Sequence, residues 1–128
     1  MLKQDTESPK KAAVRFLQLI VSGRIDDAYR DHVDMEGKHH SPYFPAGFPA
    51  LKKAMSEDQA MNPNKRLIVR NVLGDGDLVA VHSHIARCPG DPGFAVMHLF
   101  RFRAGRIVEM WDFVVVIPSD SPNADGTI

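Results

Sequence analysis

The sequence predicts one α+β domain, in which N-terminal helices pack against a mainly antiparallel sheet. In the first half of the chain, up to about Met61, apolar residues recur at helical spacing. After Lys65 the pattern changes to long apolar segments separated by short connections that contain glycine, which is typical of antiparallel strands. At 128 residues and 44% hydrophobic content, the chain is long enough for one core but not for two.

Three helices are predicted in the first half. Ser8 and Pro9 form a helix start, with serine as the N-cap and proline at the first helical position. A shorter helix is predicted over about residues 26–32 and a third over roughly residues 49–61. Residues 35–49 contain three prolines and two glycines, so this segment is predicted to be mostly loop.

The second half of the chain is predicted to form four strands. They cover about residues 66–73, 77–87, 94–103 and 106–117. Residues 1–7 are predicted to be a disordered tail, and residues 118–128 form a polar, turn-rich C-terminal tail. The ordered domain is therefore expected to span residues 8–117.

The last two predicted strands form a hairpin, and each carries an ionisable residue within an apolar run. These residues are His98 and Asp112. If Gly105 takes the left-handed position of a three-residue loop, His98 faces Met110 and Asp112 lies one diagonal step away on the same face, about 5–8 Å distant. A two-residue loop would put His98 and Asp112 on opposite faces, because a shift of one residue inverts the side-chain pattern. The spacing leaves both registers open.

Asp112 and His98 are the candidate catalytic residues. An aspartate beside Trp111 and among Val and Phe residues is partly desolvated if it points inward, and burial raises the pKa of a carboxyl group. A nearby imidazole could then transfer a proton or donate a hydrogen bond to an oxyanion. The alternative is that Asp112 faces solvent at a strand end and bonds to the backbone or to an arginine.

A second cluster, His82 and His84, lies on a single face of its predicted strand, because one residue separates the two histidines. This spacing can chelate a metal ion, and His39 and His40 could add a ligand. The glutamate that would complete such a site a few residues later is absent. Alternatively, one histidine lines a pocket while the other is hydrogen-bonded near the sheet edge. We expect no metal or other cofactor.

The composition excludes several classes of partner. Lys plus Arg and Asp plus Glu both number 16, so no net charge favours binding to nucleic acid or to an anionic membrane. The single cysteine, Cys88, cannot form an intrachain disulfide and suits a reducing compartment. The N-terminus lacks the apolar core of a signal peptide, so a cytoplasmic location is expected.

Several segments together resemble the SnoaL-like polyketide cyclases of the nuclear-transport-factor-two-like superfamily, in particular stand-alone bacterial members described as predicted aldol-condensation enzymes. The matching segments are residues 39–43 (HHSPY), 76–83 (GDLVAVHS), 100–101 (FR) and 105–112 (GRIVEMWD). The resemblance implies a cone-shaped α+β barrel, with helices against a strongly curved sheet around one deep apolar pocket. It also implies a homodimer through the outer sheet face, and it favours the bulged hairpin register in which His98 and Asp112 share a face.

The resemblance gives several of these residues a role. The family's acid/base aspartate on the last strand corresponds to Asp112, and its pocket histidine on the preceding strand corresponds to His98. His40 matches a loop histidine of the family, and His82 matches a histidine of the stand-alone members. The expected substrate-binding residues are His40, His82, Trp111, Met110, Phe100 and Tyr43.

The function expected is cofactor-free acid/base catalysis on a small carbonyl compound, by aldol-type cyclisation or isomerisation. One alternative is a dimeric protein that binds a small apolar ligand without chemistry. A third is a metal-dependent protein with histidine ligands. Fold resemblance alone does not decide between these activities.

Overall fold

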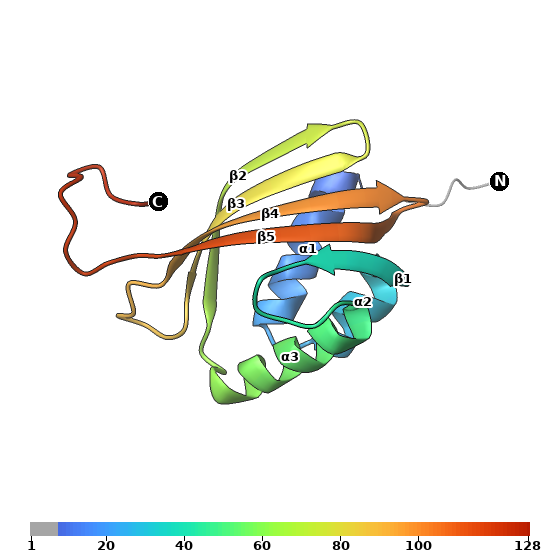
Figure 1. Cartoon of the computed structure of the whole chain (residues 1–128), viewed down its shortest axis with the longest axis horizontal. Helices are drawn as coiled ribbons and strands as arrows, with labels where there is room; N and C mark the ends of the chain where they lie inside the picture. The colour runs from blue at the N-terminus through green and yellow to red at the C-terminus, as the bar shows by residue number, and fades with distance from the viewer. Residues whose placement is uncertain (1–7) are drawn as a thin grey trace.

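The computed structural model describes residues 8–128; the predicted tail at residues 1–7 lies outside the described residues. The elements follow the order α1 (Pro9–Val21), α2 (Ile25–His32), β1 (Val33–His40), α3 (Phe48–Met61), β2 (Arg66–Asp75), β3 (Leu78–Ala86), β4 (Phe94–Arg103) and β5 (Arg106–Val116) (Figure 1). The three predicted helices and four predicted strands are confirmed, within a few residues at their ends. The predicted α+β fold is therefore correct.

The start of α1 follows the capping rule that the sequence predicted. The Ser8 hydroxyl accepts a hydrogen bond from the Lys11 backbone N–H at 3.3 Å, and Pro9 occupies the first helical position. The helix buries one face, formed by Ala12, Ala13, Phe16, Leu17 and Ile20. The Phe16 ring meets Phe100 of β4 edge-on at 5.9 Å, which fixes α1 against the sheet.

The sheet has five strands rather than four, because part of the predicted loop at residues 35–49 forms a strand. The strand order is β1-β5-β4-β3-β2, and β1 runs parallel to β5 while every other pair is antiparallel. The loop prediction for this segment is therefore wrong up to His40. Glycine and a run of polar residues hid the strand, whose partner lies about seventy residues further along the chain.

The hairpin between β4 and β5 has a shorter loop than the predicted one, but it still places His98 and Asp112 on the same face of the sheet. Arg103 pairs with Arg106, so the loop has two residues, and Ala104 and Gly105 both have positive φ, at 52° and 78°. The register then shifts, because Val108 is an extra residue on β5, between the residues paired with Phe102 and Arg101. A two-residue loop alone would place His98 and Asp112 on opposite faces, and the bulge shifts the register by one residue and brings them back to the same face.

His98 therefore faces Asp112 directly across the ladder, instead of facing Met110 as the three-residue loop predicted. The shared face is confirmed, but a bulge within the strand produces it, not the length of the loop.

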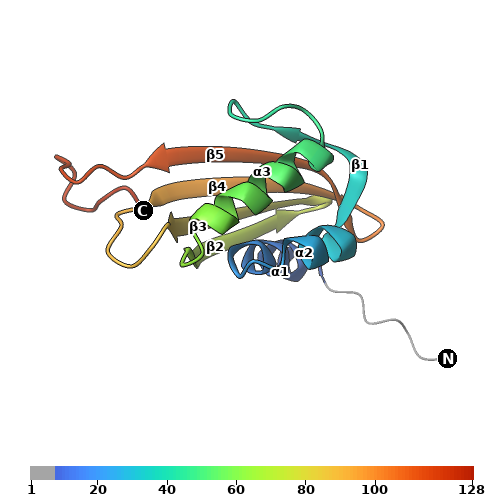
Figure 2. The ribbon, with the colours of Figure 1, turned by 90° about the horizontal axis from the view of Figure 1, so that it is seen from below.

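The helices cover the inner face of this sheet, as Figure 2 shows for α3, which lies across the strands. Inner-face side chains of β3, β4 and β5 join the helices in one hydrophobic core, among them Val79, Val81, Phe100 and Met110. No helix among residues 8–128 combines the length and the hydrophobicity that crossing a membrane requires. Residues 118–128 contain no helix or strand and leave the sheet at the end of β5 (Figure 1).

Candidate functional site

The His98–Asp112 pair lies on the inner face of the sheet. Side chains that face each other across an antiparallel ladder have Cβ atoms about 4.5–5.5 Å apart. The imidazole of His98 also stacks on Phe100, with ring centroids 5.8 Å apart and an angle of 16° between the planes. Both side chains are thus held by regular β structure rather than by a loop.

His98 and Asp112 line a cavity of about 450 Å³, which is a size typical of small-molecule sites. Its apolar walls come from β3, β4 and β5 and consist of Ile85, Phe94, Val96, Val114 and Val116. Charged side chains at one end, namely Asp58, Lys65 and Arg87, form what we call the rim. His98 and Asp112 therefore share a largely apolar chamber with a charged rim.

The chamber changes the protonation of Asp112. Burial raises the pKa of this carboxyl group, and the effect is partly opposed by the charge of a protonated His39 and by a hydrogen bond from Ser41. Its Oδ1 atom is buried and has no hydrogen-bond partner among residues 8–128. A desolvated carboxylate with an unused oxygen is a stronger base than one in water.

Burial acts on His98 in the opposite direction. The side chain is 7% exposed, and desolvation lowers its pKa to about 4. The ring is therefore neutral at physiological pH and can donate one N–H hydrogen bond. Its Nδ1 atom is buried without a partner within the described part of the chain.

We expect acid to destabilise the fold through His98. The unfolded chain binds a proton near pH 6.5, whereas the folded chain binds it only near pH 4. The free energy of unfolding should therefore fall as the pH drops from 6.5 to 4, by up to about 3 kcal/mol. Urea unfolding across this range would measure the loss. The same series on His98→Phe should show a flatter curve, and an unchanged slope would contradict the buried neutral imidazole.

Comparison with known proteins agrees with this architecture. The family model of the SnoaL-like domain matches residues 13–110. The chain belongs to the SnoaL-like family. Among curated proteins, none matches the chain.

Solved structures share the fold of this SnoaL-like domain. An NTF2-like protein of unknown function from Cytophaga hutchinsonii has a TM-score of 0.70 at 14% identity, covering 90% of this chain and 95% of that one. IdmH from Streptomyces antibioticus, a proposed polyketide cyclase, has a TM-score of 0.68 at 20% identity, with 84% and 92% covered. A proposed isomerase of the SnoaL-like family from Agrobacterium tumefaciens has a TM-score of 0.68 at 10% identity, with 85% and 99% covered. At these identities the similarity establishes the NTF2-like cone fold alone.

The cavity that contains His98 and Asp112 is lined by only some of the predicted substrate-binding residues. Tyr43, in the loop after β1, lines it together with His98 and Asp112. Phe100 and Met110 do not line it, because both are fully buried. The structure places both side chains in the hydrophobic core.

His40 and Trp111 lie on the outer face of the sheet. His40 stacks on Trp111 at 5.0 Å, and its Nε2 atom is 2.7 Å from Glu109 Oε2. Both rings line a second hollow of about 410 Å³, beside the part of β5 that continues past the end of β1. This hollow shares Tyr43 and Asp112 with the cavity of the His98–Asp112 pair. Neither ring enters the chamber that holds His98.

His82 is also separated from the pair. Val81, not His82, faces His98 across the ladder, so His82 points to the opposite side of the sheet, where its Nδ1 bonds to the Asn71 amide at 3.0 Å. His84 on the same side bonds to the Pro92 carbonyl. Within residues 8–128, no group of three or more potential metal ligands comes together.

Two polar residues of the inner face, His39 and Ser83, were not among the predicted catalytic or substrate-binding residues, and His39 was named only as a possible metal ligand. His39 pairs with Met110 of β5 and is 8% exposed, and its Nε2–H donates to the Pro45 carbonyl at 2.7 Å. Because a carbonyl only accepts, the neutral ring carries its proton on Nε2, and the buried Nδ1 is left as an acceptor. Strand alternation would have separated His39 from His40, had β1 been predicted.

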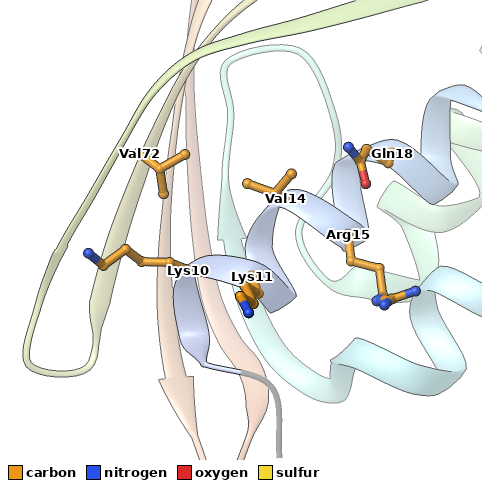
Figure 3. Close-up of a pocket in the computed structure, with 6 residues that line it drawn as sticks. All are labelled: Lys10, Lys11, Val14, Arg15, Gln18 and Val72. Carbon is orange, nitrogen blue, oxygen red and sulfur yellow. The ribbon is translucent and has the colours of Figure 1, made fainter.

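Another hollow lies between α1 and β2 (Figure 3). It is lined by Lys10, Lys11, Val14, Arg15, Gln18 and Val72. The close-up shows three cationic side chains, one amide and two valines, and the lining residues include no carboxylate that could act as a base. The inner chamber, which contains His98 and Asp112, is therefore the stronger candidate for a site of acid/base chemistry.

Proposed function

We propose that the protein is a cofactor-independent acid/base enzyme that acts on a small carbonyl compound, by aldol-type cyclisation or by isomerisation. The observation that carries this proposal is the direct pairing of His98 with Asp112 on the wall of an apolar cavity. A base of raised pKa and a neutral hydrogen-bond donor at one site are the two groups that enolisation needs.

In the proposed reaction, Asp112 removes a proton from the carbon next to a carbonyl group. The C–H electron pair becomes the C=C bond of an enolate, and the negative charge moves to the carbonyl oxygen. The neutral imidazole of His98 donates an N–H hydrogen bond to this oxygen. In a cyclisation, the enolate carbon attacks a second carbonyl of the same molecule, and the new alkoxide recovers the proton from Asp112.

His39 acts in this scheme as a positioning residue. Its charge, when protonated, lowers the pKa of Asp112, so it favours the carboxylate form of the base. The hydrogen bond to the Pro45 carbonyl fixes the orientation of the ring. In this proposal His39 changes the pKa of Asp112 without contacting the substrate carbon.

The experiment that tests the function measures proton exchange. Each member of a panel of soluble 1,3-dicarbonyl compounds is dissolved in D₂O with the protein, and NMR follows the loss of the α-proton signal. Exchange above the buffer rate supports proton abstraction, even when no ring closes. Saturable binding of these compounds without any exchange would favour the non-catalytic ligand-binding protein.

His39→Gln tests the positioning role. Glutamine can still donate to the Pro45 carbonyl but carries no charge, so the pKa of Asp112 should rise further. The acidic limb of the plot of exchange rate against pH should then move to higher pH. The pKa of Asp112 measured by NMR titration should rise by the same amount. His84→Gln is the matched control, because His84 makes the same contact to Pro92 on the outer face. Coincident acidic limbs for wild type and His39→Gln would refute the role.

We also propose a homodimer through the outer sheet face. Large apolar side chains are exposed there, namely Ile68, Leu73, Met97, Phe113 and Val115. An exposed apolar surface of this kind is typical of protein interfaces.

A further inference from the structure

The positively charged guanidinium group of Arg87 lies at the rim of the cavity that contains His98 and Asp112. Arg87 follows β3, and its guanidinium lies over the ring of Phe94, 4.6 Å from the ring centroid. Phe94 and Arg87 both line the cavity. The ring thus keeps the cation at the entrance instead of leaving it free in solution.

The guanidinium has no ion pair or hydrogen bond to a side chain in the described part of the chain. The nearest acidic residue along the chain, Asp91, accepts hydrogen bonds from the backbone N–H groups of Arg87 and Gly93, at 2.8 Å and 3.2 Å. The charge of Arg87 lowers the pKa of Asp91, but the guanidinium donates no hydrogen bond to it. The other cation of the rim, Lys65, is already paired with Asp58. Arg87 is therefore the rim cation with unused donors.

The ladder fixes the separation between this cation and the base. Phe94 pairs with Val116, and His98 pairs with Asp112, four residues further along β4. At about 3.3 Å per residue, the backbone position of Phe94 lies about 13 Å along β4 from that of His98. The wall between them is apolar and includes Val96 and Val114.

We infer that the cavity takes an elongated apolar carboxylic acid, whose carboxylate binds Arg87 at the rim and whose reacting carbonyl reaches Asp112. This inference rests on the proposed function and adds the class of substrate to it. The planar guanidinium matches a carboxylate with two parallel N–H···O bonds, which a neutral ester or amide cannot form. The apolar wall suits the carbon skeleton between the two ends.

The test compares two unreactive probes that differ only in charge, phenylvalerate and phenylvaleramide. Isothermal titration calorimetry of the wild-type protein at low salt should show that the acid binds about fivefold more tightly, as for an ion pair at a water-exposed site. High salt should weaken this preference. Equal affinity for acid and amide, including failure of both to bind, would overturn the inference.

Two variants locate the cation. Arg87→Gln should bind acid and amide equally, with the amide affinity unchanged. Arg103→Gln removes the same charge from an exposed residue at the opposite end of β4 and should keep the fivefold preference. A preference that survives in Arg87→Gln would overturn the inference. Because neither probe carries a ketone, the result is independent of catalysis: acid binding at Arg87 without any α-proton exchange would retain this site and reject only the proposed chemistry.

Discussion

Replacing Asp112 with Asn is expected to abolish α-proton exchange, with a loss of about 10²–10⁴-fold. An amide has nearly the same shape as a carboxylate but cannot accept the proton. Because burial raises the pKa of Asp112, the folded protein favours the uncharged form of this side chain. The protonated carboxyl therefore adds to the free energy of unfolding at pH values below the pKa that Asp112 has in the unfolded chain. This contribution is lost as the pH rises through the higher pKa of the folded protein. The variant should therefore be at least as stable as wild type at neutral pH.

The measurement combines exchange in D₂O with thermal unfolding followed by circular dichroism. The control is Asp75→Asn, which makes the same chemical change at an exposed position where β2 ends. Asp75→Asn should retain wild-type exchange. Substantial exchange by a folded Asp112→Asn protein would reject Asp112 as the base, and a large loss of stability would show that the carboxylate is structural.

Replacing Gly37 with Ala is expected to cause a large loss of stability for the addition of a single methyl group. A Cβ at this position would run into the Val108 carbonyl and would lie 2.8 Å from the ring of Phe48. The obstacle is backbone, which cannot move aside as a flexible side chain would. We expect a loss of about 3 kcal/mol, or a melting temperature lower by about 10 °C.

Gly76→Ala is the matched control for Gly37→Ala. Gly76 has a positive φ of 61°, but a Cβ there meets nothing within 4 Å. Its substitution should cost only the strain of a left-handed alanine, about 1 kcal/mol. Thermal unfolding of the two variants compares steric contact with backbone strain. Equal losses would show that β1 does not approach β5 as closely as the fold requires.

The position of Gly37 explains how the bulge and the site depend on each other. Val108 is the extra residue of β5, and β1 shifts its register with β5 over the same stretch, between Val33 and Lys38. Only a residue without a side chain lets the two irregular backbones meet. The same approach brings His39 beside Met110 on the inner face.

Local patterns were sufficient to predict most of the elements. The serine cap and the following proline set the start of α1, and the turn residues separated β2, β3, β4 and β5. These signals act within a few residues of one another. Strand β1 was missed because its partner, β5, is distant in sequence and its own residues are mostly polar.

The site was predicted in part, for the same physical reason. His98 and Asp112 were identified because an ionisable group within an apolar strand is unusual. Which faces they share depends on the Val108 bulge, and loop length alone would have given the opposite answer. His39 was passed over in favour of His40, because the alternation of a strand cannot be applied to a predicted loop.

The sequence by itself determined the α+β class, the three helices and four of the five strands, and it singled out His98 and Asp112 as ionisable residues within apolar strands. Each of these depends on periodicity, capping or composition over short distances. Tertiary structure alone decided that His98 faces Asp112. It also decided that His39 points inward while His40 and His82 point outward. The position of Arg87 at the cavity rim likewise depends on the folded chain. These features depend on the register of strands and on the packing of distant segments. One inserted residue reverses a face, and no local pattern records it.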